Sequence, residues 1–193
     1  MRKHKPEEPY ENRLPGGNPE WEPFSHFFNR EEIPAKTLLL REGEIARKAF
    51  YIEKGCLRVW FNREGREITF QFFFEGQGVS SVESFRTNTP SLFNIETIEP
   101  SVIHVIAKND FEHILSHSEA IRRTIEQHTL ERLIYYQRLF LSHIKNSPQE
   151  RYEALLKDHP AILHRVPQHY IASYLGITPV HLSRIRNSLL KRK

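Results

Sequence analysis

A group of polar side chains near the C-terminal end has the composition and spacing of a surface that reads nucleic acid. A helix is predicted over residues 179–191, in which Leu182, Ile185 and Leu189 repeat at helical spacing and would face a core. On the opposite face, Arg184 could donate two parallel hydrogen bonds to the O6 and N7 atoms of guanine. The side chains predicted to contact base edges are Val180, His181, Arg184, Asn187 and Ser188.

The charge of the surrounding segment favours the same partner. The chain has 28 Lys and Arg against 24 Asp and Glu, yet residues 160–193 contain six basic and no acidic residues. A cationic end is typical of a segment that binds a polyanion, although a solvated basic tail would have the same composition. The other candidates for DNA contacts, mainly to phosphates, are Gln168, His169, Thr178, Ser183, Arg186 and Lys191.

Two helices must present these side chains to a duplex. A first short helix is predicted over 167–175, and Gly176 has the position of a left-handed residue that ends a helix. Thr178 is a candidate N-cap, and Pro179 suits the first turn of the second helix. Helix, glycine turn and helix is the arrangement of a helix-turn-helix unit, which we place in an all-α domain over residues 147–193.

The middle of the chain has the pattern of antiparallel strands. Between residues 33 and 107, runs of β-branched and aromatic residues are interrupted by turn residues at short intervals, which suggests a roll or barrel over residues 21–117. Residues 1–20 are rich in proline and predict a flexible arm. One run alternates in a way that predicts a buried face and a wetter face: Leu57, Val59 and Phe61 against Arg58, Trp60 and Asn62.

A long helix is predicted over residues 118–146, because this stretch contains no proline or glycine. It carries two apolar stripes, and a helix with two stripes would pack on its own domain and on a second helix. A coiled-coil-like homodimer is the simplest such contact, and a core helix within one chain is the alternative. The predicted dimer interface consists of Ile125, Thr129, Leu133, Tyr136, Phe140 and Ile144; the second stripe is Leu130, Ile134 and Leu141.

Composition excludes several other classes of protein. A hydrophobic fraction of 38% and the lack of a long apolar run predict no membrane segment, and we expect a cytoplasmic protein without a signal peptide. Cys56 is the single cysteine, so neither an internal disulfide nor a cluster held by cysteines can form. No catalytic motif is present, so we expect no enzyme.

Three segments of the chain resemble the Crp/Fnr family of bacterial regulators. They are LREGE at 40–44, FYIEKGCLRV at 50–59, and YIASYLGITP at 170–179 followed by LSRIR at 182–186. The resemblance implies an α+β protein with an N-terminal antiparallel β-roll, a double-stranded β-helix of the cyclic-nucleotide-binding type. It further implies a long dimerisation helix, a C-terminal helix-turn-helix, a homodimer that binds double-stranded DNA, and a sensor that responds to an effector.

The sequence departs from the family's cyclic-AMP binders at their charged anchors. Those proteins carry a Gly-Glu pair and, after a short helix, an Arg-Ser or Arg-Thr pair; aligned on Phe85, these positions read Ser80-Ser81 and Pro90-Ser91 here. A phosphate without its arginine loses a charge-assisted hydrogen bond, so we expect no cyclic AMP in the usual mode, with Arg86 as the one substitute nearby. The candidate effector pocket consists of Ser80, Ser81, Val82, Phe85, Arg86, Pro90 and Ser91.

Cofactors and further partners are less constrained. No cofactor or metal is predicted: His113 and His117 stand four residues apart, but surface or capping roles explain them better. RNA polymerase and an unknown small-molecule effector are further candidate partners. We also expect the usual β-wing to be missing after the second helix. A ligand-binding or protein-interaction signalling module that does not bind DNA is the alternative function.

Overall fold

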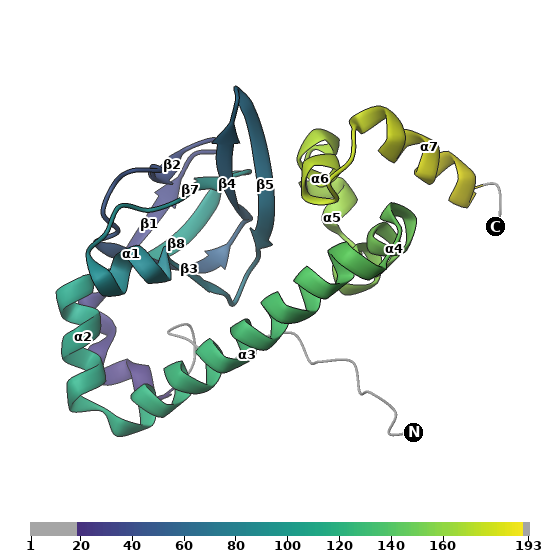
Figure 1. Ribbon diagram of the computed structural model, residues 1–193. Coiled ribbons are helices and arrows are strands. Elements are labelled where there is room, and N and C mark those ends of the chain that lie inside the picture. The colour runs from purple at the N-terminus through teal and green to yellow at the C-terminus, as the bar shows by residue number, and fades with distance from the viewer. Residues whose placement is uncertain (1–18, 191–193) are drawn as a thin grey trace, which may run out of the picture.

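The computed structural model describes residues 19–190 of the chain, as a β-roll followed by a series of helices (Figure 1). The first element is a short 3₁₀ helix, η1 (Pro19–Phe27), whose Trp21 is buried against later helices. The predicted arm over residues 1–20 lies outside the described residues except for Pro19 and Glu20. These two residues begin η1, so the arm was predicted to extend slightly too far.

Two four-stranded antiparallel sheets form the roll. Sheet A has the strand order β1-β8-β3-β6, and sheet B has the order β2-β7-β4-β5. The short helix α1 (Val82–Thr87) lies between β6 and β7 in the chain. The strands are β1 (Asn29–Ile33), β2 (Leu38–Leu40), β3 (Lys48–Lys54), β4 (Leu57–Arg63), β5 (Arg66–Phe73), β6 (Gly78–Val79), β7 (Asn94–Thr97) and β8 (Ser101–Ala107).

The sequence pattern missed two of these strands, β1 and β6. Strand β1 reads Asn-Arg-Glu-Glu-Ile and is an edge strand with exposed side chains, so it lacks the apolar alternation that marks a strand. Strand β6 has only two residues, which is too short for any periodicity. Both are held by pairing with strands of sheet A that are distant in sequence, β8 and β3.

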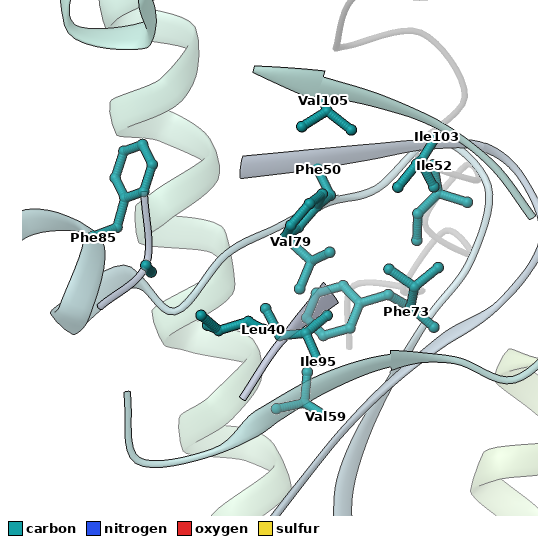
Figure 2. Close-up of a cluster of buried hydrophobic side chains, with 12 residues drawn as sticks. Leu40, Phe50, Ile52, Val59, Phe73, Val79, Phe85, Ile95, Ile103 and Val105 are labelled. Atoms are coloured by element: carbon teal, nitrogen blue, oxygen red, sulfur yellow. The ribbon is translucent and has the colours of Figure 1, made fainter. Parts of the chain in front are cut away.

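The core of the roll lies between the two sheets (Figure 2). Alternate residues of facing strands point into it, and Figure 2 shows Ile52, Ile103 and Val105 of sheet A on one side of the cluster and Val59 and Ile95 of sheet B on the other. Each such side chain, when removed from water, contributes about 1.5–3 kcal/mol. Gly55 lies in the tight turn between β3 and β4, where its φ is 115°. A Cβ added at this position would lie 2.2 Å from the Ser101 Oγ, so glycine is the residue that fits.

Helices follow the roll without interruption. The first is α2 (Lys108–His117), and α3 (Glu119–Lys145) is the predicted long helix. Ser118 caps α3 by accepting a hydrogen bond from the Ile121 amide, and Ser147 and Glu150 form a capping box at the start of α4 (Pro148–Asp158). The remaining helices are α5 (Ile162–Arg165), α6 (Gln168–Tyr174) and α7 (Pro179–Leu190).

The C-terminal helices share a core with the roll. Their buried side chains, among them Tyr152, Ile171 and Leu182, form one cluster with Cys56, Phe72 and Ile98 from the roll. In Figure 1, α6 lies beside β5, and α7 lies on the side of α6 that faces away from the roll. The C-terminal helices are therefore placed directly against sheet B.

Candidate nucleic-acid interface

Helices α6 and α7 form a helix pair joined by a tight turn. Gly176 has a φ of 68°, the left-handed conformation predicted for it, and the Ile177 amide donates to the Ala172 carbonyl at 3.0 Å. The Thr178 hydroxyl accepts from the His181 amide at 3.2 Å and so caps α7. Leu182 and Ile185 are buried, which leaves the other face of α7 free of core contacts.

The face of α7 away from the core carries the side chains predicted to read bases. Val180 is 62% exposed, and His181, Arg184 and Asn187 are exposed, whereas Ser188 is half-buried. No acidic residue occurs in α7, so no carboxylate of this helix would repel a phosphate. Together these side chains form a polar helix face with the positive charge of Arg184 and no negative charge.

An open hollow lies beside this face and includes a residue that the sequence analysis missed. Gln149, at the start of α4, lines the hollow together with Thr178, Val180, His181, Arg184, Ile185 and Ser188. Gln149 follows the Ser147 cap and Pro148, but nothing local indicates that α4 begins next to α7. The only signal in the sequence is a polar residue at a helix start, which many unrelated helices share.

The other predicted DNA-contact residues lie around the helix pair. Gln168, His169 and Ser183 are exposed, and Lys191 lies outside the described residues. Arg186 is half-buried and lies near the buried phenol of Tyr152; burial raises the pKa of Tyr152, and the Arg186 charge partly lowers it. Arg186 is therefore less available to a duplex than Arg184.

The residues of the predicted effector pocket divide between the interior and the surface. Ser81, Phe85 and Ser91 are buried, and the Ser81 and Ser91 hydroxyl oxygens are 3.0 Å apart. The Ser91 hydroxyl also donates to the Phe93 carbonyl at 2.8 Å. Val82, Arg86 and Pro90 are exposed, and the Ser80 hydroxyl donates to the Lys48 carbonyl at 3.3 Å.

Helix α3 presents a broad apolar surface that the described part of the chain leaves largely exposed. Most of the predicted interface is exposed: Leu133 by 64%, Phe140 by 67% and Ile144 by 65%. Tyr136 and Thr129 are also exposed, although the Thr129 hydroxyl donates to the Ile125 carbonyl. We define this surface, the α3 stripe, as Leu130, Leu133, Ile134, Tyr136, Phe140, Leu141 and Ile144.

Two details of α3 differ from the prediction. The second stripe was expected to pack on its own domain, but Leu130, Ile134 and Leu141 are 51%, 40% and 39% exposed. Ile125, expected in the dimer contact, packs against the cluster of Trp21, Ile106, Ile114 and Ile121 in its own chain. Only the first two turns of α3 rest on η1 and α2, because the helix then runs away from them (Figure 1).

Three further observations concern the histidines and the long helices. Among residues 19–190, no group of three or more His, Cys, Asp or Glu side chains is arranged to hold a metal ion. The rings of His113 and His117 stack at 4.0 Å, and the His117 Nδ1 lies 2.8 Å from the His113 carbonyl. Within the same range, no helix is both long enough and apolar enough to cross a bilayer.

Comparison with known proteins defines the class of the fold. Residues 30–118 match the sequence profile of the cyclic nucleotide-binding domain. The chain thus combines a β-roll of the cyclic nucleotide-binding type with a C-terminal series of helices, and it shares this fold with several solved structures. No curated protein matches the chain in sequence.

Three solved structures illustrate this similarity. CLP from Xanthomonas campestris, described as a c-di-GMP responsive global regulator, has a TM-score of 0.72 and 18% identity, covering 90% of this chain and 91% of its own. FixK2 from Bradyrhizobium japonicum has a TM-score of 0.74 and 15% identity, covering 86% and 85%. A CooA mutant from Carboxydothermus hydrogenoformans has a TM-score of 0.69 and 18% identity, covering 93% and 82%.

Proposed function

We propose that this protein is a homodimeric, sequence-specific DNA-binding transcription regulator of the Crp/Fnr type, with no enzymatic activity of its own. The observation that carries the proposal is the exposed, acid-free face of α7, which displays Arg184 beside Val180 and His181. A helix with such a face fits the major groove of B-DNA, where side chains near its N-terminal end reach base edges. The fold shared with CLP and FixK2 supports the same assignment.

The α3 stripe supports the homodimer. Its seven large apolar side chains follow one another along four turns of a single helix, and each is at least 37% exposed. Monomeric proteins rarely leave so continuous an apolar surface in water, and a second copy of the same helix would cover it symmetrically. A symmetric pair would also present two α7 helices to two half-sites of a duplex.

Selection of bound duplexes from a random library tests the proposal as a whole. We expect the full-length protein to enrich one sequence, composed of two related half-sites in inverted orientation. Binding should weaken steeply as salt is added, because phosphate contacts release counterions. Failure to enrich any sequence, together with no binding of DNA at low salt, would instead favour a signalling module that does not bind DNA.

Replacement of Arg184 tests which side chain reads bases. In the dimer, Arg184→Ala removes one bidentate donor from each half-site, each worth about 1–3 kcal/mol, so we expect about 25- to 20,000-fold weaker binding to the selected site, measured by fluorescence anisotropy. Specificity should relax at one base pair of each half-site. Arg123→Ala, which removes an exposed arginine of α3, is the matched control and should leave affinity unchanged. Equal affinity of wild type and Arg184→Ala would contradict the assigned role.

We also propose that cyclic AMP is not an effector in the usual mode. The matched anchor positions carry Ser81 and Pro90, and neither offers a charge to a ribose hydroxyl or a phosphate. The Ser81 and Ser91 hydroxyls are close enough to bond each other inside the protein. Isothermal titration of protein that binds its selected duplex should therefore give no heat of binding at micromolar cyclic AMP, and a micromolar dissociation constant would disprove this proposal.

A further inference from the structure

The contact between α6 and sheet B combines a shared apolar cluster with a set of buried polar groups. The outer face of sheet B, which we call the docking face, includes the buried polar residues Arg58, Thr69 and Glu96. The alternation of β4 predicted this face to be wetter, but Arg58 is only 1% exposed because α6 covers it.

A serine of α6 makes hydrogen bonds to backbone groups at the free edge of strand β5. Strand β5 is the last strand of sheet B, so its outward amides and carbonyls have no neighbouring strand. The Ser173 hydroxyl accepts from the Thr69 amide at 2.9 Å and donates to the Glu67 carbonyl at 3.1 Å. One hydroxyl thus takes the place of a neighbouring strand, and it does so only when α6 is docked.

A buried arginine of the roll contacts the first turn of α6. The Arg58 guanidinium donates to Glu96 at 2.7 Å and to Glu67 at 2.5 Å. The ring of Tyr170 lies over it, with 3.7 Å between the guanidinium carbon and the ring centroid. Since a desolvated cation over an aromatic ring contributes more than an exposed one, this contact holds α6 at one position on β4.

A second arginine ties the segment before α6 to the roll. Arg165, at the end of α5, donates to Glu75 at 2.7 and 3.0 Å and to Glu99 at 3.0 Å. Both carboxylates belong to turns of the roll, so these bonds cross from one part of the molecule to the other. Arg165, Tyr170 and Ser173 therefore contact the roll at three separate points, which fixes both the position and the direction of α6.

We infer that docking of α6 on sheet B sets the half-site spacing that this regulator reads. The inference rests on the proposed DNA-binding function. Because α7 is joined to α6 by the Gly176 turn and a shared core, a fixed α6 gives a fixed α7 in each protomer. Two fixed α7 helices match half-sites at one separation, about one helical turn of DNA, whereas undocked helix pairs on flexible hinges match several. Arg165, Tyr170 and Ser173 are positioning residues in this scheme.

The test compares variants that differ only in the docking contact. The docking variant, Arg165→Gln with Ser173→Ala, removes the ion pairs and the cap on β5 without altering the exposed face of α7. Its matched control, Arg123→Gln with Ser116→Ala, removes an ion pair and a serine hydroxyl bond that lie wholly within α2 and α3. A further variant, Glu75→Gln with Glu99→Gln, breaks the same Arg165 ion pairs by changing the two carboxylates of the roll. It also replaces the docking variant if that protein does not fold.

Two measurements on each full-length protein are needed. Amide hydrogen exchange at Thr69 reports docking in the Glu75→Gln with Glu99→Gln variant, which keeps the Ser173 hydroxyl, and we expect it to be about tenfold faster there and unchanged in the control. Selection from random duplexes reports spacing: wild type and control should enrich half-sites at one separation, whereas the docking variant should enrich the same half-site at several separations.

The outcomes separate this inference from the proposed function. A single retained spacing in the Glu75→Gln with Glu99→Gln variant, together with fast Thr69 exchange, would overturn the inference while leaving DNA binding established. An unprotected Thr69 amide in wild type would overturn it as well, because the contact would then be absent in solution. No enriched sequence for wild type, with Thr69 protected as expected, would overturn the proposed function and the spacing inference that depends on it.

Discussion

Leu133→Ser combined with Phe140→Ser will convert the dimer into monomers and abolish binding to a two-half-site duplex at concentrations where wild type binds. Both side chains lie in the α3 stripe and are 64% and 67% exposed in a single chain. A dimer buries two copies of each, and about 1 kcal/mol per side chain gives about 4 kcal/mol, or roughly a thousandfold in the dissociation constant of the dimer. Analytical ultracentrifugation measures the change directly.

A matched substitution elsewhere distinguishes the α3 stripe from any exposed apolar residue. Val82 and Leu92 of the roll are 61% and 68% exposed, close to the values for Leu133 and Phe140. Val82→Ser with Leu92→Ser should leave a dimer of unchanged affinity. If the Leu133 and Phe140 variant stays dimeric at micromolar concentration, the two chains associate through another surface and the proposed arrangement of the α7 helices is wrong.

Arg58→Ala will destabilise the protein by about 3–5 kcal/mol, measured as the free energy of unfolding in urea. The substitution leaves the carboxylate of Glu96 without its partner at a site where the side chain is only 12% exposed. It also removes the cation beneath the ring of Tyr170. A loss of this size is a large fraction of the roughly 5–15 kcal/mol by which native proteins are stable.

A second substitution separates the charge from the space that Arg58 fills. Arg58→Met with Glu96→Leu removes both buried charges and keeps apolar volume, so it should recover much of the stability lost in Arg58→Ala. Arg122→Ala, which breaks an exposed ion pair with Glu119, should leave the free energy of unfolding nearly unchanged. If Arg58→Ala is as mild as Arg122→Ala, the buried network contributes little to the folded state.

Much of the helix pair could be predicted because its determinants are local. Gly176 takes a left-handed conformation that other residues resist, Thr178 caps α7, and Pro179 suits its first turn. The same holds for α3, where 27 residues without a helix breaker follow the Ser118 cap. Such signals depend on a few neighbouring residues, so the local conformation that they predict does not depend on contacts with the rest of the chain.

The sequence pattern could not predict which distant segments of the chain pack together. The alternation in β4 placed Arg58 on a wetter face, because period two separates two faces but does not reveal that a helix from another part of the chain will cover one of them. Strand β1 was not predicted for a related reason. Its polar residues form a strand only because they pair with β8. Gln149 lines the hollow beside α7 because of how α4 packs, and no pattern in the neighbouring residues predicts this position.

By itself the sequence determined the class of elements, the helix pair with its exposed basic face, and the apolar α3 stripe. Only the tertiary structure decided that α6 rests on sheet B, that Arg58 is buried beneath Tyr170, and that Ser173 completes the edge of β5. Local conformation follows from short-range sterics and capping, which neighbouring residues specify. The orientation of one domain on another follows from contacts between residues about a hundred positions apart, such as Thr69 and Ser173, and these exist only once both surfaces have folded.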